Sequence, residues 1–389
     1  MNNETEPAAE PAPRAVGAQV ATPYRLVSEE GLAPRAPTGG GAAARRVLPA
    51  FRAAYGFTSQ YFPAILLVAI ALTILGVYHS GGLTLMGQQV RNALVLGAIY
   101  ALIAIGYTMV YGIIELINFA HGDVFALSGF YAIVIAEALG LDKLATSGLG
   151  GLLVALIVLF TLSMIAAGLT GMLIERVAYR RLRDAPRVAP LITAIGVSFL
   201  IEGFLLVFFG PDNVATNKAN WITGNAFSAG GVAVGFKDIF VVGIALVLMF
   251  ALGAFVRGTK LGKAMRSTAQ DRAAALLCGI NINRTIALTF FIGSALAAAG
   301  AIVYSINYGD VQWNLGFRLG IIAFTAAVLG GIGNIVGAGI GGFLIGIIYV
   351  FGGSLAGGEW AESLIFAVLV LILTFRPVGL FGIDVGTRA

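Results

Sequence analysis

The stretch Leu152-Leu-Val-Ala-Leu-Ile-Val-Leu-Phe-Thr-Leu-Ser-Met-Ile-Ala-Ala-Gly-Leu-Thr-Gly-Met-Leu-Ile174 contains no charged residue. A helix of about 20 apolar residues crosses the roughly 30 Å hydrocarbon core of a bilayer. Over the whole chain 58% of the residues are hydrophobic and 11% are charged, whereas a typical soluble domain has about 25% charged residues. The composition therefore excludes a water-soluble protein.

Runs of the same kind recur along the chain and predict an all-α fold, a polytopic transmembrane helical bundle of about eight to ten spans. Uniformly apolar runs favour helices over a membrane β-barrel, whose strands alternate apolar and polar residues. We divide the stretch 319–352 at Gly333-Asn334, because one straight helix of that length would exceed the bilayer thickness. The expected spans are residues 62–78, 88–114, 120–140, 150–175, 189–210, 238–256, 285–306, 319–334, 337–352 and 362–375.

The Lys and Arg residues are distributed unequally between the connecting segments. With the N-terminus in the cytoplasm, all but five of the 24 fall on the cytoplasmic side, which is the positive-inside pattern. We therefore expect a multi-pass protein of the bacterial inner membrane with both termini in the cytoplasm. The net charge of +5 then reflects orientation and requires no nucleic-acid partner. The five basic residues left on the outer side are Arg91, Lys143, Lys218, Lys237 and Arg318.

Composition also divides the chain into segments. The first forty residues are rich in Ala, Pro and Gly, and such a segment cannot bury enough apolar surface to fold, so we expect 1–60 to be a disordered cytoplasmic tail. This tail lacks the charged start and apolar core of a signal peptide, so 61–87 is expected to be an additional, uncleaved anchor helix. The main transmembrane domain then occupies 88–382, with a cytoplasmic loop at 257–284, and 383–389 form a C-terminal tail.

Polar residues interrupt the apolar pattern between Leu116 and Phe125. Such groups are costly inside a membrane unless they are paired or face water, so they are functional-site candidates. Two interpretations stay open: Asn118 and Asp123 cap a helix end by accepting backbone N–H groups, or the segment is a broken, re-entrant piece whose helix N-terminus faces a pathway and attracts a carboxylate. The pathway candidates are Asn118, His121, Asp123, Tyr107 and Tyr111.

Two further residues have plainer interpretations. Glu202 lies well inside a span, where we expect it to be hydrogen-bonded against a neighbouring helix. Cys278 is the only cysteine, so no intrachain disulfide is available, and nothing nearby has the spacing of zinc ligands. A lone cysteine is usually a small buried residue, and we expect the same here.

The loop Arg257–Arg284 predicts a short helix outside the membrane. Residues 264–279 are mostly good helix formers and end in Gly279, a plausible C-cap. Ala274 and Leu277 would share an apolar face with Asp271 or Ala273. Such a helix requires the membrane surface or a partner, and insertion into a groove of a partner protein is the sharper hypothesis. Glu175 or Asp184, after the fourth span, is a candidate to pair across to this loop.

Glycines at four-residue spacing mark close helix contacts near the C-terminus. Close packing is the main interpretation. The alternative is that contacts made only by small residues let the helices slide during gating. The glycines concerned are Gly333, Gly337, Gly341, Gly342 and Gly346.

Several motifs in a fixed order together resemble the LivH-type permease of the branched-chain amino acid ABC importers. The resemblance runs from about Gln88 to Gly382. The motifs are Leu94-Val-Leu-Gly-Ala-Ile-Tyr-Ala-Leu-Ile-Ala-Ile-Gly-Tyr-Thr-Met-Val-Tyr-Gly-Ile-Ile114, Ile117-Asn-Phe-Ala-His-Gly-Asp123, Ile174-Glu-Arg-Val-Ala-Tyr-Arg180, Leu191-Ile-Thr-Ala-Ile-Gly196, Leu277-Cys-Gly-Ile-Asn281 and Ala323-Phe-Thr-Ala-Ala-Val-Leu-Gly-Gly-Ile-Gly333.

The resemblance implies an ABC permease subunit. Such a subunit pairs with a LivM-type permease, two cytoplasmic ATPase subunits of the LivG and LivF type and a periplasmic amino-acid-binding protein. It also implies that 266–281 carries the coupling helix that inserts into an ATPase cleft. The opening Glu of the family's motif is absent, and Ala273-Ala-Ala275 occupies the region. The residues assigned to ATPase coupling are Arg266, Asp271, Arg272, Ala274, Leu277, Gly279 and Asn281.

ATP chemistry is not encoded in this chain. A phosphate-binding loop requires G-x-x-x-x-G-K-[ST], and the nearest approach, Gly258-Thr-Lys-Leu-Gly-Lys-Ala264, has the wrong spacing. We therefore expect a non-catalytic permease without cofactor or metal, with ATP-Mg bound by its partners and lipid around it. Leucine, isoleucine and valine are the expected substrates, and other amino acids, amides or urea-like solutes stay open.

Two other function classes were weighed against the importer. An ion-coupled secondary transporter usually shows matched interrupted helices in two halves, and the pattern at Asn118 has no second copy. A membrane enzyme would need a nucleophile and base or a metal cluster in one site. The two histidines, His79 and His121, fall at different expected depths. The importer is therefore favoured, with the secondary transporter as the alternative.

Overall fold

The computed structural model describes residues 42–114, 118–183, 185–186 and 188–382, with side chains from Thr58 onward. The helical bundle lies in the second of two units, Tyr55–Ala389, and the first unit ends at Ala54. The α-helices are α1 (Ala42–Ile114), α2 (Ala120–Ala138), α3 (Leu141–Ala145), α4 (Leu149–Ile174), α5 (Val188–Phe209), α6 (Phe236–Gly258), α7 (Lys260–Gln270), α8 (Arg272–Leu277), α9 (Ile282–Tyr308), α10 (Leu315–Gly330), α11 (Ile335–Ala356) and α12 (Ala361–Phe375).

Short elements connect these helices. A π-helical turn η2 (Glu175–Tyr179) and a 3₁₀ turn η3 (Arg180–Leu182) follow α4. Strand β1 (Val214–Ala215) pairs antiparallel with β4 (Asp310–Val311), and β2 (Asn225–Ala229) pairs antiparallel with β3 (Val232–Gly235). Two further 3₁₀ turns are η4 (Asn217–Asn220) and η5 (Gly358–Trp360).

Helix α1 contains two of the expected spans, 62–78 and 88–114, joined at a kink. Gly82 has φ 67° and ψ −166°, which no helix residue adopts. Glycine tolerates this conformation because it has no Cβ. The helix begins at Ala42, so the prediction of a disordered tail up to residue 60 is wrong from Ala42 onward. Residues 1–41 of that tail and the C-terminal tail 383–389 lie outside the described residues.

The other eight expected spans correspond to α2, α4, α5, α6, α9, α10, α11 and α12. Within the described residues seven helices are long and apolar enough to cross a membrane, and the first of them, Thr58–Ile114, includes both arms of the kink. Helix α10, with 16 residues, is a shorter apolar helix, and α2, with 19 residues, carries His121 and Asp123 in its first turn. The predicted fold class, a polytopic helical membrane bundle, is confirmed.

The bundle has inner and outer helices. In the most apolar stretch of α9, 83% of the residues are buried inside the chain, against 22% for α5 and 33% for α4 and α6. The outer helices expose large apolar side chains such as Leu149, Leu200 and Val207. A lipid environment suits these side chains as they stand, because hydrocarbon is as apolar as they are.

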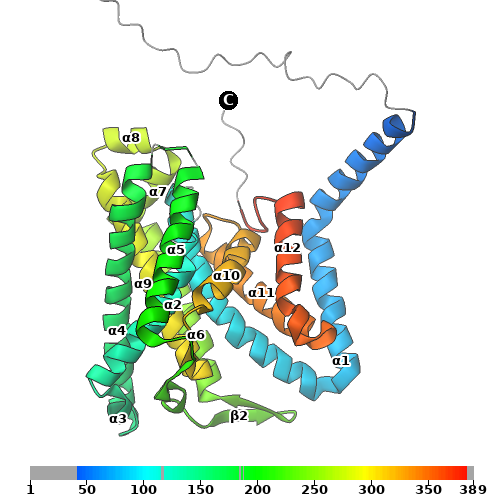
Figure 1. Ribbon diagram of the computed structural model, residues 1–389. Coiled ribbons are helices and arrows are strands. Elements are labelled where there is room, and N and C mark those ends of the chain that lie inside the picture. Colours follow the sequence, from blue (N-terminus) through cyan, green and yellow to red (C-terminus); the bar gives the residue numbers. More distant parts are fainter. Residues whose placement is uncertain (1–41, 115–117, 184, 187, 383–389) are drawn as a thin grey trace, which may run out of the picture. The chain divides into compact units, whose positions relative to one another are not determined.

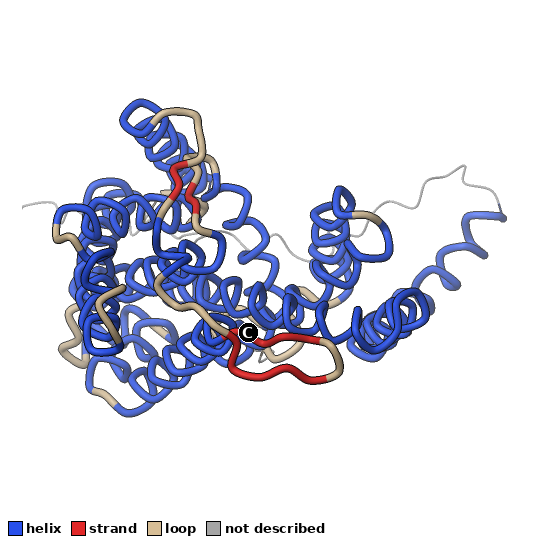
Figure 2. Tube along the Cα trace, turned by 90° about the horizontal axis from the view of Figure 1, so that it is seen from below, coloured by secondary structure: helices blue, strands red, loops and turns tan. Residues whose placement is uncertain are grey.

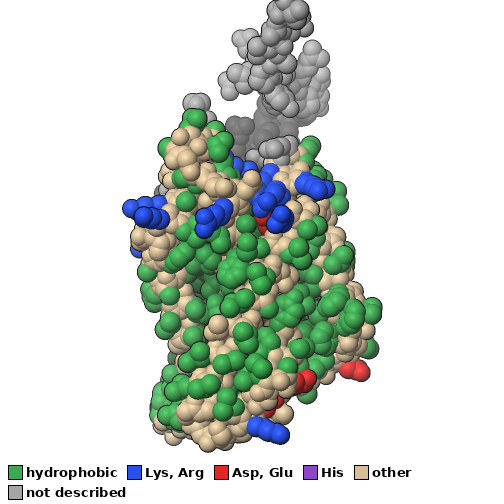
Figure 3. All heavy atoms as spheres, turned by 90° about the vertical axis from the view of Figure 1, so that its left-hand side faces the viewer, with side chains coloured by type: hydrophobic (Ala, Val, Ile, Leu, Met, Phe, Trp, Pro, Cys, Tyr) green, Lys and Arg blue, Asp and Glu red, His purple; other side chains and the backbone are tan. Residues whose placement is uncertain are grey.

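The two ends of the bundle differ in structure and in charge. We call the end that carries η2, η3, α7 and α8 the basic end, because Lys and Arg side chains gather there in Figure 3. The other end, which we call the opposite end, carries α3 and the β2–β3 hairpin (Figures 1 and 2). The hairpin packs on α1, where Arg91 donates a hydrogen bond to the carbonyl of Ala233 at 2.7 Å.

Glycines of α11 permit close contacts with two neighbouring helices. A Cβ on Gly337 or Gly341 would clash with the backbone of α10, and a Cβ on Gly342 would lie 2.7 Å from the Cβ of Ala101 in α1. Gly346 likewise faces the backbone of α1. Gly333 does not have the expected packing role, because a Cβ added there would have no atom within 4 Å. It lies between α10 and α11 and has φ 90°.

Candidate functional site

Asn118, His121 and Asp123 form a buried polar cluster at the start of α2, with exposed fractions of 5%, 1% and 0%. The hydroxyl of Tyr179, in η2, donates to Oδ1 of Asn118 at 2.8 Å. The hydroxyl of Ser198, in α5, donates to Oδ2 of Asp123. These two bonds connect α2 to the end of α4 and to α5.

Of the two interpretations of this segment, the structure does not show the one in which Asn118 and Asp123 cap a helix. The N-cap position of α2 is Phe119, and no side chain accepts a hydrogen bond there. The turn is closed instead by the main chain, since the N–H of His121 donates to the carbonyl of Asn118 at 3.1 Å. Gly122 is helical and does not break α2. Because a main-chain hydrogen bond closes this first turn, the side chains of Asn118 and Asp123 are available to bond other helices.

Helices meet closely around this cluster because small residues line the contacts. The rings of Tyr107 and His121 lie edge to face, 4.7 Å apart at 64°. A Cβ on Gly106 would lie 2.8 Å from Cε1 of His121, and a Cβ on Gly122 would lie 2.7 Å from the Cα of Gly320 in α10. The cluster therefore depends on glycines at these contacts, which make room for the ring of His121 between α1 and α2 and let α2 approach α10 closely.

The structure places the five pathway candidates in different surroundings. Tyr107 is buried with the cluster, whereas Tyr111, one turn later, is half-buried. None of the five lines either of the two cavities described below. Glu202 is half-buried on α5, one turn after Ser198, so it lies along the same helix as the residue that contacts Asp123.

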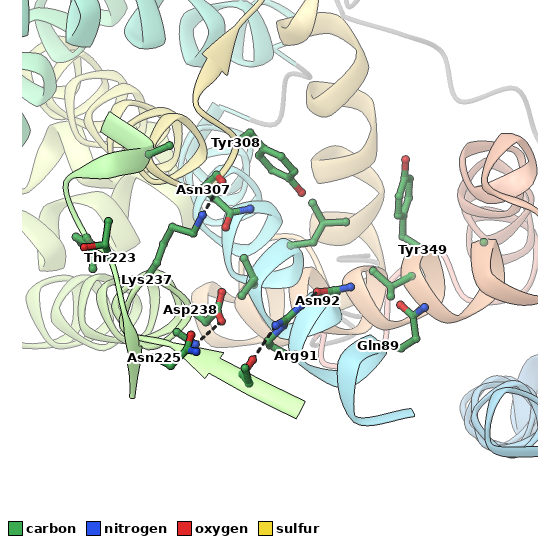
Figure 4. Close-up of a pocket in the computed structure, with 18 of the residues that line it drawn as sticks. Gln89, Arg91, Asn92, Thr223, Asn225, Lys237, Asp238, Asn307, Tyr308 and Tyr349 are labelled. Carbon is green, nitrogen blue, oxygen red and sulfur yellow. Dashed lines mark hydrogen bonds between the residues drawn. The ribbon is translucent and has the colours of Figure 1, made fainter. Parts of the chain in front are cut away.

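A polar cavity of about 830 Å³ lies at the opposite end. Arg91 of α1 and Lys237 and Asp238 of α6 line it, together with Tyr308 of α9 and Tyr349 of α11 (Figure 4). None of these was a site candidate in the sequence. A signal was present, however, because Arg91 and Lys237 are two of the five basic residues that depart from the positive-inside pattern.

The charges in this cavity are held by neutral partners. Lys237 donates to the main-chain carbonyl of Asn307 at 3.1 Å, and Arg91 donates to that of Ala233 and to the side-chain carbonyl of its neighbour Asn92. Oδ2 of Asp238 accepts from the N–H of Gly235 at 2.9 Å and so caps the start of α6. Neither cation forms an ion pair with a described residue. The cavity therefore presents two cations and one carboxylate to a bound molecule, which suits a zwitterion.

The basic end carries the segment expected to couple to an ATPase. One continuous helix was predicted over 264–279, but Asp271 breaks it into α7 and α8, with φ −156° and ψ 113°. The carboxylate of Asp271 accepts from the N–H of Ala274 at 3.0 Å and so caps α8. Aspartate is a favoured N-cap residue, so it ends one helix and starts another instead of sharing an apolar face.

The end of α8 is as predicted. Gly279 has φ 78°, and the N–H of Ile280 donates to the carbonyl of Ala275 at 3.0 Å, which together form a glycine C-cap. Asn281 then caps α9 by accepting from the N–H of Arg284 at 3.0 Å. The helix is thus held at both ends although it has only six residues.

Large apolar side chains of α8 are exposed. Leu277 is 89% exposed and Leu276 is 62% exposed, whereas Ala275 is buried. Ala274 is also exposed, and so is Cys278, which contradicts the expected burial of that cysteine. Apolar side chains are thus exposed on a short helix that is capped at both ends.

Arginines attach this segment to the bundle. Arg272 donates to the carbonyl of Ile114, at the end of α1, at 2.8 Å, and Arg266 donates to the carbonyl of Val256. Glu175, a candidate partner of the loop, pairs with Arg180 and Arg183 on its own segment. Arg183 in turn donates to Oδ1 of Asn283 at 2.6 Å, so the connection to the loop is indirect. Asp184, the other candidate, lies outside the described residues.

The long apolar helices place the chain among the polytopic helical membrane proteins. The match to a protein family is more specific than this class. The chain belongs to the family described as branched-chain amino acid transport system, permease component, which matches residues 89–373. The resemblance expected from the motifs is thereby confirmed, and the chain is a multi-pass protein of the inner membrane.

Known relatives agree with this family. The high-affinity branched-chain amino acid transport system permease protein BraD of Pseudomonas aeruginosa is 41% identical over 298 residues, covering 76% of this chain and 95% of that protein. LivH of Escherichia coli K12 is 40% identical with the same coverage. The probable LivH of Methanocaldococcus jannaschii is 23% identical over 307 residues, covering 76% of this chain and 92% of that protein. No solved structure matches the chain.

Proposed function

We propose that this chain is the permease subunit of an ATP-driven importer that moves leucine, isoleucine, valine or related small solutes across the bacterial inner membrane. The observation that carries the proposal is the identity of 40–41% over 95% of the length of BraD and LivH, which are branched-chain amino acid permeases. The distribution of Lys and Arg supports placing both termini and the basic end in the cytoplasm.

The proposed partners follow from the two ends of the bundle. At the basic end α8 docks into a groove of a LivG- or LivF-type ATPase, with Leu277 as the central contact, because this side chain is apolar and 89% exposed. Two such ATPases bind ATP-Mg, and this chain holds neither cofactor nor metal and catalyses no reaction. A LivM-type permease forms the other half of the pathway, and a periplasmic amino-acid-binding protein docks at the opposite end.

The polar cavity at the opposite end receives the amino acid from the binding protein. Lys237 and Arg91 bind the substrate carboxylate, and Asp238 binds the ammonium group. Charge-assisted hydrogen bonds of this kind are about twice as strong as neutral ones. The cations can form them because their present partners are neutral carbonyls, which do not cancel the positive charge.

The polar cluster of α2 is proposed to contribute to the pathway when α1, α2 and α10 separate. In the described arrangement Asn118, His121 and Asp123 are closed off by the contacts of Gly106, Gly122 and Gly320. A displacement of α10 would open this region by separating the ring of Phe324 from those of Tyr107 and Phe119. The carboxylate of Asp123, in the first turn of α2, is stabilised by the helix dipole.

Co-purification tests this assignment. The native complex, isolated through a tag on this chain and analysed by mass spectrometry, should contain a second permease and two ATPases. Its ATP hydrolysis should rise when the binding protein and leucine are added. A chain that purifies without ATPase subunits yet carries solute in response to a proton or sodium gradient would instead be an ion-coupled secondary transporter, the alternative that the membrane carboxylates Asp123 and Glu202 would favour.

A further inference from the structure

A second cavity, of about 840 Å³, lies at the basic end. It is bounded by the turns that follow α4, by α8 and by the start of α9. Its polar wall includes Arg180, Arg183 and Arg272, and its apolar wall includes Leu276, Ile280 and Ile286. The proposed docking contact centres on Leu277, which does not line this cavity. The resemblance to the LivH-type permeases also assigns Arg272, Gly279 and Asn281 to ATPase coupling, and these three residues do line it.

Positive charge exceeds negative charge in the described part of this cavity. Glu175, fully buried, forms ion pairs with Arg180 and Arg183. Arg272 donates to the main-chain carbonyl of Ile114 and forms no ion pair with a described residue. Asp271, next to it in the chain, is occupied as the cap of α8. Three guanidinium groups therefore lie near one described carboxylate, and only two of them pair with it. The excess positive charge suits an anion with several oxygen atoms.

The guanidinium groups are close enough to influence one another. Burial lowers the pKa of Arg183, the neighbouring carboxylate of Glu175 opposes this effect, and the positive charges of Arg180 and Arg272 add to the lowering. Arginine stays protonated at any physiological pH. The repulsion is therefore not relieved by loss of a proton, and a bound anion would relieve it.

The position of the cavity at the end of a candidate membrane span and its apolar wall indicate which anion fits. The candidate membrane span that begins at Leu149 ends at Leu182, so Arg180 and Arg183 lie at the end of that span. Val177 and Val188, on either side of these arginines, are 68% and 61% exposed. A free anion would use only the polar wall, whereas a phospholipid uses both, because its phosphate and acyl chains meet at this depth.

We propose that this cavity binds the phosphate of an anionic glycerophospholipid, which bridges the turn after α4 to the coupling helix α8. The lipid would hold Arg272 and Arg180 in one ionic network and so fix the angle at which α8 is presented. The inference concerns residues that do not contact substrate, so it stands or fails independently of what the chain transports.

Lipid binding by the full chain tests this proposal. The purified protein in phosphatidylcholine nanodiscs would be titrated with phosphatidylglycerol, and bound lipid counted by native mass spectrometry. We expect phosphatidylglycerol to be retained in preference to phosphatidylcholine. Arg180→Gln and Arg272→Gln should each weaken its binding about fivefold, the effect of one basic residue near a charged headgroup. Arg284→Gln is the matched control, because Arg284 is exposed on the same segment and does not line the cavity.

Each alternative outcome contradicts the proposal. Equal retention of the two lipids would show that charge plays no part. A loss in Arg284→Gln as large as in Arg180→Gln would indicate diffuse attraction to the surface. Displacement of the lipid by an equal concentration of inorganic phosphate would assign the site to a free anion. Should Arg272→Gln fail to fold, Arg180→Gln decides the question, because Arg183 keeps its ion pair with Glu175 in that variant.

Discussion

The two ends of the bundle contain cavities of nearly equal volume, about 830 and 840 Å³, but they satisfy their charges in different ways. At the basic end a buried carboxylate fixes two arginines in ion pairs. At the opposite end Arg91 and Lys237 donate to neutral carbonyl groups. Fixed charges suit a ligand or partner that stays, whereas cations held only by neutral groups suit one that binds and leaves. Under the function proposed above, this difference would distinguish the end that couples to the ATPases from the end that receives substrate.

The largest effect is expected from a charge placed on the exposed face of α8. Leu277→Asp should lower ATP-driven uptake at least about thirtyfold, since buried apolar anchors of protein interfaces contribute about 2 kcal/mol or more. The fold should survive, because Leu277 is 89% exposed in the isolated chain. Uptake and ATP hydrolysis by the reconstituted complex measure the effect.

Cys278→Ser provides the control for this change, because Cys278 is the exposed neighbour and lies past the end of α8. It should retain normal uptake. Were Leu277→Asp to stimulate ATP hydrolysis like the unmodified chain, α8 would not be the docking helix, and the assignment of the two ends would lose its main support.

A smaller effect is expected from the cavity at the opposite end. Lys237→Gln removes a positive charge that the substrate carboxylate would meet, so leucine uptake at saturating binding protein should fall about tenfold. Lys143→Gln is the matched control, because Lys143 lies at the same end and is exposed outside the cavity. Equal losses in both variants would point to electrostatic docking of the binding protein and not to contact with the amino acid.

The helix contacts between the two ends should respond to added volume. Gly342→Ala places a Cβ 2.7 Å from that of Ala101, and overpacking of this kind typically costs about 1–3 kcal/mol. Thermal unfolding in detergent measures the loss. Gly203→Ala in α5 is the control, because no atom lies within 4 Å of the added Cβ. A stable Gly342→Ala variant would mean that α11 and α1 separate easily.

The last effect concerns the pH dependence of stability at the opposite end. Burial lowers the pKa of Lys218 from 10.5 to about 8, although Asp142 and Glu137 act in the other direction. Below pH 8 the folded protein carries the cost of the buried charge. Between about pH 8 and 10.5 the folded state loses this proton while the unfolded state keeps it, so the free energy of unfolding should rise with pH, by at most about 1.4 kcal/mol per unit.

Unfolding at pH 7, 8, 9 and 10 measures this slope, and Lys218→Met is the comparison. The variant should lose the rise above pH 8. An identical slope in both proteins would assign the pH dependence to other groups and would remove Lys218 as a titrating residue of this end.

The helices were predictable from the sequence because apolar length alone determines a membrane span. Periodicity and composition could not predict the break at Asp271, since good helix formers continue on both sides of it. The cap preference of aspartate contained that information, and the structure shows that it outweighs the propensity of the neighbouring alanines.

The contacts of the site were less accessible to sequence analysis. Asn118 bonds Tyr179, and Asp123 bonds Ser198, on elements far along the chain. Such pairs depend on how helices pack, which a single sequence does not specify. Arg91 and Lys237 were identifiable only as exceptions to the positive-inside pattern. Both line the polar cavity at the opposite end.

Uptake of labelled leucine into liposomes tests the central claim most directly. The complex of this chain with its proposed partners should accumulate leucine only when ATP is on the side of the basic end and the loaded binding protein is on the other. Accumulation by this chain alone, driven by an ion gradient without ATP, would contradict the account.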